Sequence, residues 1–200
     1  MISITLMNNL LDLLTEAEKK SVIYKKLQKD EILFLEDGIC NSIGVIIDGH
    51  IDIVSYSFSG KEMVYNSLKK NDVFGNNLLF SDSPRYKGNV ISKEKSIVGL
   101  INKETLLHLL KSNEKFLVEY LKIQSNFGKS LNAQIKLLSL DNALERFQYY
   151  LFSNNNEIHY KNVASLAKTL HLERETLSRL LSKLEKEVVI YRDKHLIKYL

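Results

Sequence analysis

The chain has 200 residues, of which 44% are hydrophobic and 26% are charged, a balance typical of an ordinary globular protein with one large or two small domains. No apolar run approaches the ~18 residues that span a bilayer, and the N-terminus lacks the order of a signal peptide, so we expect a cytoplasmic protein without membrane association. The single cysteine, Cys40, excludes an intrachain disulfide and cannot alone hold an iron–sulfur cluster.

The charge is distributed unevenly along the chain. Residues 1–160 hold 19 basic and 19 acidic side chains, whereas residues 161–200 hold nine basic and five acidic ones. The whole net charge of +4 therefore lies in the C-terminal segment. This asymmetry is expected if that segment meets a phosphate backbone, although many domains that bind no nucleic acid reach the same charge.

The N-terminal half is predicted to be mainly β-strand. A leading helix is expected from about Leu6 to Lys20, after which the apolar pattern alternates until about Ile101. Three short runs rich in β-branched and aromatic residues are separated by Asp48-Gly49 and Ser59-Gly60 turns: residues 43–47, 51–56 and 62–68. Short strands joined by glycine turns favour an antiparallel roll or barrel.

From about Lys103 the pattern becomes helical, with a short helix before Asn113 and a longer one after it. The longer helix carries a seam with the heptad spacing of a left-handed coiled coil, which predicts a dimer axis: Leu117, Leu121, Gln124, Gly128, Leu131, Ile135 and Leu138. Gln124 and Gly128 weaken the middle of this seam. A polar and a flexible residue at these positions could fix the register of a dimer or act as a hinge. The alternative is that the segment is simply a core helix with an imperfect apolar face.

Three aromatic residues beside the seam, Phe116, Tyr120 and Phe127, are expected to pack the long helix against the roll. Asp141 is predicted as the N-cap of a following helix that runs through Phe152. The polar stretch 153–156 then forms a loop.

A pair of short amphipathic helices follows this loop. The first has a small-residue apolar face of Val163, Ala164, Leu166, Ala167 and Leu170. The second buries a stripe of Leu177, Leu180, Leu181 and Leu184 and places Arg174, Glu175, Ser178 and Arg179 on the opposite face. In a DNA major groove, Arg can donate two hydrogen bonds to guanine O6 and N7, and Glu can accept one from cytosine N4. Ser can form a hydrogen bond with a phosphate or with the edge of a base. The alternative is a solvated face with a Glu175–Arg179 pair.

Beyond the second helix, two apolar runs bracket a charged tip and predict a hairpin, the wing of a winged helix. The runs are residues 188–191 and 196–199, and the tip is residues 192–195. Arg192 and Lys194 at this tip could touch phosphates, although hairpin tips are also charged for solubility alone.

The segment LERETLSRLLSKLE resembles the recognition helix of the Crp/Fnr transcription regulators, whose Arg-Glu-Thr-x-x-x-Arg core matches Arg174, Glu175, Thr176 and Arg179. Two positions depart from that pattern. His171 stands where the family has a turn glycine, and His tolerates the left-handed conformation better than most residues. Glu173 stands where a small polar residue is usual and is a weaker N-cap.

The roll motifs also resemble this family, so the resemblance spans nearly the whole chain: Phe34-x-Glu36-Asp37-Gly38, Asp48-Gly49-His50-Ile51 and Asn71-Asp72-Val73-Phe74-Gly75. It implies an α+β fold with an antiparallel β-roll (a double-stranded β-helix of the cyclic-nucleotide-binding type), a long dimerisation helix and a C-terminal winged helix-turn-helix. The implied domains are residues 1–112, 113–139 and 140–200.

The resemblance implies a homodimeric regulator that binds double-stranded DNA at an inverted repeat through recognition helix 173–186. Base readout falls to Arg174, Glu175 and Arg179, supported by Ser178 and Ser182. Lys168 and Lys183 are expected to contact phosphate. RNA polymerase is a further candidate partner, and the sequence does not choose between activation and repression.

The family's phosphate-binding cassette is altered here. Gly75 is kept, but Asn76-Asn77 follows in place of the acid that binds a ribose hydroxyl, so cyclic AMP binding is disfavoured. The candidate effector site is Gly75, Asn76, Arg85, Tyr86 and Lys87. An unknown effector and no effector both remain open, because these residues also fit a tight turn with solvated charges. No cofactor or metal is expected.

Other classes of function fit less well. An enzyme needs a catalytic constellation, and neither a phosphate-cradling loop nor a metal-ligand spacing is present, so we expect no enzymatic activity. A cyclic-nucleotide-responsive or haem-based sensor stays an alternative, with Cys40 or His50 as a haem ligand. A protein-interaction scaffold without DNA binding is the third possibility.

Overall fold

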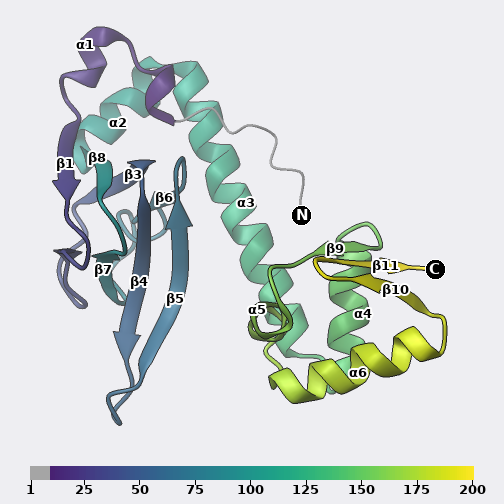
Figure 1. Cartoon of the computed structure of the whole chain (residues 1–200). Helices are drawn as coiled ribbons and strands as arrows, with labels where there is room; N and C mark the ends of the chain where they lie inside the picture. Colours follow the sequence, from purple (N-terminus) through teal and green to yellow (C-terminus); the bar gives the residue numbers. More distant parts are fainter. Residues whose placement is uncertain (1–9) are drawn as a thin grey trace. The chain divides into compact units, whose positions relative to one another are not determined.

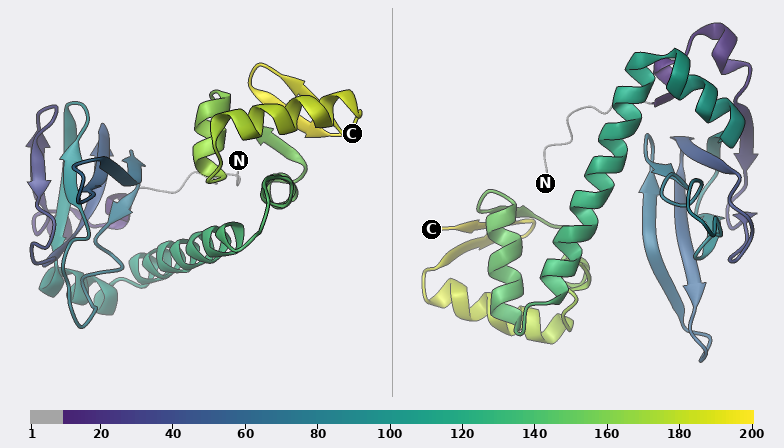
Figure 2. Two further views of the ribbon diagram at one scale, coloured as in Figure 1. Left: turned by 90° about the horizontal axis from the view of Figure 1, so that it is seen from below. Right: turned by 180° about the vertical axis from the view of Figure 1, so that it is seen from behind.

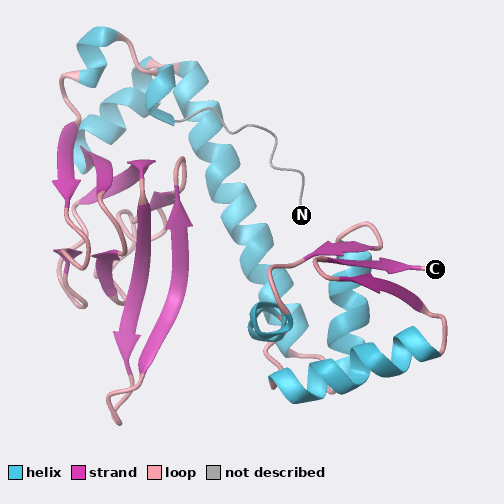
Figure 3. Cartoon of the chain, viewed as in Figure 1, coloured by secondary structure: helices cyan, strands magenta, loops and turns pink. Residues whose placement is uncertain are grey.

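The computed structural model describes residues 10–200, and its contacts divide them into two compact units, residues 10–126 and residues 127–200 (Figure 1). Each unit contains its own strands (Figure 3). Within the described part of the chain, no helix is both long enough and apolar enough to cross a membrane.

The first unit is a β-roll made of two four-stranded antiparallel sheets. One sheet has the order β1-β8-β3-β6 and the other β2-β7-β4-β5. The strands are β1 Ile23–Leu27, β2 Ile32–Phe34, β3 Ser42–Asp48, β4 His50–Tyr56, β5 Glu62–Lys69, β6 Val73–Phe74, β7 Asn89–Ser92 and β8 Ser96–Asn102. The three predicted runs are confirmed as β3, β4 and β5. Gly49 makes the turn between β3 and β4 with a φ of +94°, a conformation that favours glycine.

The core of the roll lies between its sheets and under its helices. Ile43, Val45 and Ile46 of β3 are all 0% exposed, because both faces of this strand are covered. A continuous apolar run is the expected pattern for such a strand. By contrast, β5 is almost entirely exposed. It is the edge strand of its sheet, where only one side is paired with another strand.

The leading helix predicted for Leu6 to Lys20 is wrong in its described part, and residues 6–9 lie outside the described residues. The chain forms a 3₁₀ turn, η1 Leu10–Leu13, and a separate helix, α1 Glu16–Lys19. Thr15 divides them because it caps α1: its hydroxyl accepts from the Glu18 amide at 3.3 Å, and the Glu18 carboxylate accepts from the Thr15 amide at 2.7 Å.

Two helices follow the roll strands, α2 Lys103–Ser112 and α3 Glu114–Leu138. Asn113 separates them as predicted, with a non-helical φ of −127° and a side chain that accepts from the Phe116 amide at 3.1 Å. Phe116 and Tyr120 are buried in the roll core, as expected, but the same prediction for Phe127 is wrong, because its side chain is exposed and is not part of that core. Figure 2 shows that α3 continues as one helix.

The second unit contains the last turns of α3, three further helices and a three-stranded antiparallel sheet of order β10-β11-β9. The elements are α4 Ala143–Ser153, β9 Glu157–His159, α5 Val163–Thr169, α6 Arg174–Lys186, β10 Ile190–Asp193 and β11 Leu196–Tyr199. Helices α5 and α6 with the β10–β11 hairpin form a winged helix-turn-helix. The strand β9 was not predicted.

The N-cap predicted for α4 is wrong by one residue. Asn142, not Asp141, accepts from the Glu145 amide at 3.0 Å. One core joins α4, α5, α6 and the sheet, and Leu137 near the end of α3 is buried in it. The C-terminal turn of α3 is therefore built into the second unit.

Candidate nucleic-acid interface

The turn between α5 and α6 has the geometry of a helix-terminating Schellman motif. The His171 amide donates to Lys168 O at 3.2 Å, and the Leu172 amide donates to Ala167 O at 2.9 Å. His171 has a φ of +51°, so the prediction that it adopts the left-handed conformation is confirmed. The turn therefore keeps helix-turn-helix geometry without a glycine.

Helix α6 begins after Glu173, whose backbone is extended and whose side chain makes no cap hydrogen bond, as predicted. On α5, Ala164 is exposed, so its predicted place on the apolar face is wrong. The face follows the spacing i, i+3, i+4 and i+7 from Val163, and Ala164 lies beside it. Most of the stripe predicted for α6 is buried, with Leu177 and Leu181 at 0% exposure and Leu180 half-buried.

The opposite face of α6 is open to solvent. Arg174, Glu175, Ser178 and Arg179 are all exposed. The Arg179 guanidinium lies 3.6 Å from the Glu175 carboxylate, with these side chains 81% and 86% exposed. An exposed pair of this kind contributes only about 0.3–0.5 kcal/mol. The pairing that the sequence left as an alternative is thus present, and it is weak enough to be exchanged for a base or a phosphate.

A shallow open hollow runs along the C-terminal part of this face. Its lining residues are Ser178, Arg179, Ser182, Lys183, Lys186 and Glu187. Ser182 is half-buried, and Lys183 lies 3.9 Å from Glu187. Lys186 was missed by the sequence analysis, although its position three residues after Lys183 and seven after Arg179 places it on the same face.

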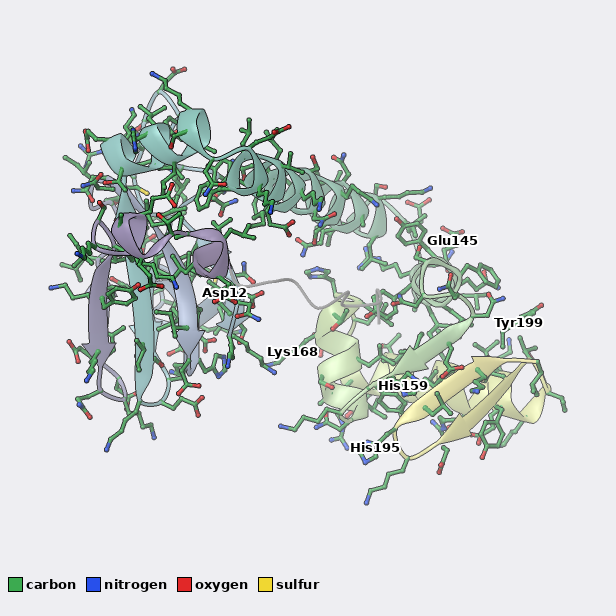
Figure 4. The ribbon with its side chains drawn as sticks, turned by 90° about the horizontal axis from the view of Figure 1, so that it is seen from above. Asp12, Glu145, His159, Lys168, His195 and Tyr199 are labelled. Carbon is green, nitrogen blue, oxygen red and sulfur yellow. The ribbon has the colours of Figure 1, made fainter. Side chains whose placement is uncertain are left out.

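The remaining predicted phosphate contact, Lys168, lies on α5 and is exposed (Figure 4). On the wing, Lys194 and His195 form the turn between β10 and β11. Arg192 was predicted at this tip, and that position is wrong: it pairs with Ile197 within the hairpin. Its guanidinium binds the Glu185 carboxylate of α6 at 2.9 Å and so ties the wing to the recognition helix.

The candidate effector residues of the roll are divided between its interior and its surface. Asn76 is only 4% exposed; its side-chain amide donates to Gln124 Oε1 at 2.5 Å, and Gln124 Nε2 donates to Asn76 O at 3.0 Å. Gln124 was expected in the dimer seam, and this is wrong, because it faces the roll. Tyr86 is buried and stacks on Phe34 with ring centroids 4.6 Å apart. Burial raises the pKa of its hydroxyl.

The other candidates sit elsewhere. Arg85 is exposed and donates to Asp37 O at 2.6 Å, and Lys87 is exposed. Gly75 has a φ of +76°, and a Cβ there would lie 2.9 Å from Ser42 O, so this turn requires glycine. Arg85 and Lys87 therefore lie on the surface of the roll, whereas Asn76 and Tyr86 lie in its interior.

The two candidate haem ligands are engaged within the roll. The buried Cys40 thiol has two backbone acceptors within reach of its one proton, Ser42 O at 3.5 Å and Gly75 O at 3.7 Å, and burial raises its pKa. His50 Nε2 lies 3.0 Å from the Asp52 carboxylate. Among the described residues, no group of three or more His, Cys, Asp or Glu side chains is placed to hold a metal ion.

Residues 24–113 match the family model described as the cyclic nucleotide-binding domain. The anaerobic regulatory protein of Bacillus subtilis is 27% identical over 180 residues, which cover 84% of this chain and 76% of that protein.

Two solved structures share the fold. A CooA mutant from Carboxydothermus hydrogenoformans aligns over 96% of this chain and 91% of its own, with a TM-score of 0.69 and 17% identity. The Thermus thermophilus catabolite activator protein aligns over 96% and 94%, with a TM-score of 0.57 and 16% identity.

A roll that matches this family model, followed by a winged helix-turn-helix, makes the chain similar in fold and sequence to transcription regulators of the Crp/Fnr type.

Proposed function

We propose that the protein is a homodimer that reads an inverted-repeat DNA operator with two copies of α6. The observation that carries this proposal is the open polar face of α6, whose exposed Arg174, Glu175 and Arg179 stand opposite its buried leucine stripe. Arg and Glu side chains match the donor and acceptor patterns of guanine and cytosine in the major groove. Ser178 and Ser182 support this readout, and Lys168, Lys183 and Lys186 bind phosphate.

The proposed dimer axis is α3. Apolar side chains along this helix are exposed, each by between 38% and 57%: Val118, Leu121, Phe127, Leu131, Ile135 and Leu138. Leu121 and Ile135 are two heptads apart, and Leu131 and Leu138 are one heptad apart, which is the spacing of a left-handed coiled coil. A second copy of α3 would cover this stripe, and the two recognition helices would then enter successive major grooves about 34 Å apart.

The proposed domains are residues 1–112 for the roll, 113–139 for the dimerisation helix and 140–200 for DNA binding. The roll binds an unknown effector or none. The contacts of Asn76 with Gln124 join the altered cassette to the proposed dimer helix. We place the protein in the cytoplasm, where RNA polymerase is a candidate partner.

The test is selection from a random pool of duplex DNA by the purified protein, at near-physiological salt and with no added ligand. Enrichment of an inverted repeat with half-sites one helical turn apart is the expected result, and it would also show that no added effector is needed. If neither this selection nor a repeat with cell extract enriches a repeat, the proposed function is wrong.

A further inference from the structure

Arg146, on the first turns of α4, binds three main-chain carbonyl groups from two separate segments. Its Nε donates to Leu140 O at 3.1 Å, Nη2 lies 3.4 Å from Leu138 O, and Nη1 donates to His171 O at 2.9 Å. The side chain is half-buried, and no carboxylate pairs with it within residues 10–200. It therefore acts as a link between backbone segments rather than as one half of an ion pair.

The first two carbonyls belong to the end of the proposed dimer helix. Leu138 is the last residue of α3, and Leu140 lies in the connection to α4. The last carbonyls of a helix have no partner within it, and a cation beside them is favoured by the helix dipole. Arg146 therefore fixes the point at which α3 gives way to the DNA-binding helices.

The third carbonyl belongs to the turn of the helix-turn-helix. His171 holds the left-handed conformation without being glycine. On the other side of the turn, Glu173 supplies no side-chain cap to α6. The start of the recognition helix thus lacks a local side-chain restraint, and Arg146 supplies one from α4.

The chemistry of the guanidinium group suits this task. Its N–H donors are fixed in one plane and point in several directions, so one side chain can hold carbonyls from different segments at once. A lysine ammonium keeps the charge but is a compact group on a flexible stem. Replacing Arg146 by lysine would therefore separate the fork geometry from the charge.

We propose that Arg146 is a positioning residue that sets the orientation of the recognition helix relative to the end of α3. The inference rests on the proposed function, because in the dimer this orientation fixes the distance between the two reading heads. Arg146 would thereby determine which half-site spacing the regulator accepts, without contacting DNA.

The test uses the operator selected by the wild-type protein and four versions whose half-site spacing is changed by one or two base pairs in either direction. Binding of the full-length wild type, Arg146→Lys and the control Lys198→Arg is measured on all five. We expect Arg146→Lys to lower the preference for the selected spacing about tenfold, the equivalent of one charged hydrogen bond. Lys198→Arg exchanges the same two basic groups in the same unit, at a side chain that pairs with Glu157 rather than with α6, and should keep the preference.

A readout without DNA accompanies this measurement. In wild-type protein the Arg146 Nε–H proton should exchange slowly with solvent by NMR, and Arg146→Lys should speed exchange of the neighbouring Leu172 amide. Equal loss of affinity at all five spacings, in step with lost thermal stability, would mean a merely structural role and overturn the inference. So would an unchanged spacing preference. A wild-type protein that selects no repeat would instead overturn the proposed function.

Discussion

The candidate functional residues of the two units differ in their exposure to solvent. In the roll, Asn76 and Tyr86 are buried and engaged by other side chains. In the DNA-binding unit, Arg174, Glu175 and Arg179 project from a helix whose other face is in the core. Two of the candidate effector residues of the roll are thus buried in its interior, whereas the polar face of α6 is exposed to solvent.

This difference shows what each unit contributes in the proposed regulator. Buried polar groups are costly unless they are hydrogen-bonded, so the Asn76–Gln124 contact stabilises one arrangement of the roll with the first half of α3. Exposed charges cost little to redirect, so the face of α6 can meet DNA without breaking the fold. Substitutions in the two units should therefore separate stability from DNA binding.

The largest effect on stability is expected from a substitution on the buried face of α6. Leu181→Ala removes a fully buried side chain, and it should lower the free energy of unfolding by about 2–5 kcal/mol. Ser178→Ala, on the exposed face of the same helix, should change it by no more than about 0.5 kcal/mol. Denaturant unfolding followed by circular dichroism measures both, and equal effects would contradict the assignment of the faces.

The next effect concerns base readout. Arg179→Ala should weaken operator binding by about 1–3 kcal/mol and relax the preference at one base pair, with no loss of stability. Lys183→Ala is the matched control: it should weaken all sequences alike and reduce the slope of affinity against salt by about 1. Titrations of operator variants at several salt concentrations distinguish the two. Unchanged affinity and preference in Arg179→Ala would remove it from the readout.

A smaller effect should come from the cassette. In a double-mutant cycle, Asn76→Ala and Gln124→Ala should show a coupling energy of about 1 kcal/mol in unfolding, because each substitution removes the hydrogen bond from the Asn76 side-chain amide to Gln124 Oε1. The neighbouring Asn77 is exposed, so Asn77→Ala should not couple to Gln124. Additive effects of Asn76→Ala and Gln124→Ala would mean that this contact does not join α3 to the cassette.

The smallest effect is a pH dependence at the wing sheet. Hydrogen bonds from Lys198 and then His159 hold the pKa of Glu157 below its ordinary value of 4.5. Because this pKa is lowered by folding, the stabilisation is fully present above the ordinary value and is lost as pH falls through the folded-state pKa. Thermal unfolding of the wild type should lose its advantage over Glu157→Gln on acidification. A constant difference across that range would rule out this contribution.

Local patterns predicted most of the fold, and they failed where a choice depended on distant contacts. Alternating β-branched residues predicted β3, β4 and β5, and the turn position predicted the left-handed His171. Asp141 and Asn142 are both good N-caps, and only the path of the chain after α3 decides between them. The break at Thr15 is an exception, because its capping contacts with Glu18 are local and were missed within a continuous helical pattern.

The candidate site shows the same limit. Helical spacing alone predicted the exposed face of α6, since every residue involved lies on one helix. Heptad spacing placed Gln124 in the seam because it cannot report that Asn76, 48 positions away in the chain, binds it. Arg146 left no signal at all, since its partners are backbone carbonyls and these are the same for every residue type.

The exposed apolar stripe of α3 also bears on how the amount of protein would govern its activity. In the proposed dimer, pairing follows mass action, so the paired fraction rises with protein concentration, and so does the temperature of unfolding. Because operator binding needs two linked reading heads, occupancy would rise more steeply than in proportion to the number of chains. Synthesis and degradation could then switch the regulator without any small molecule.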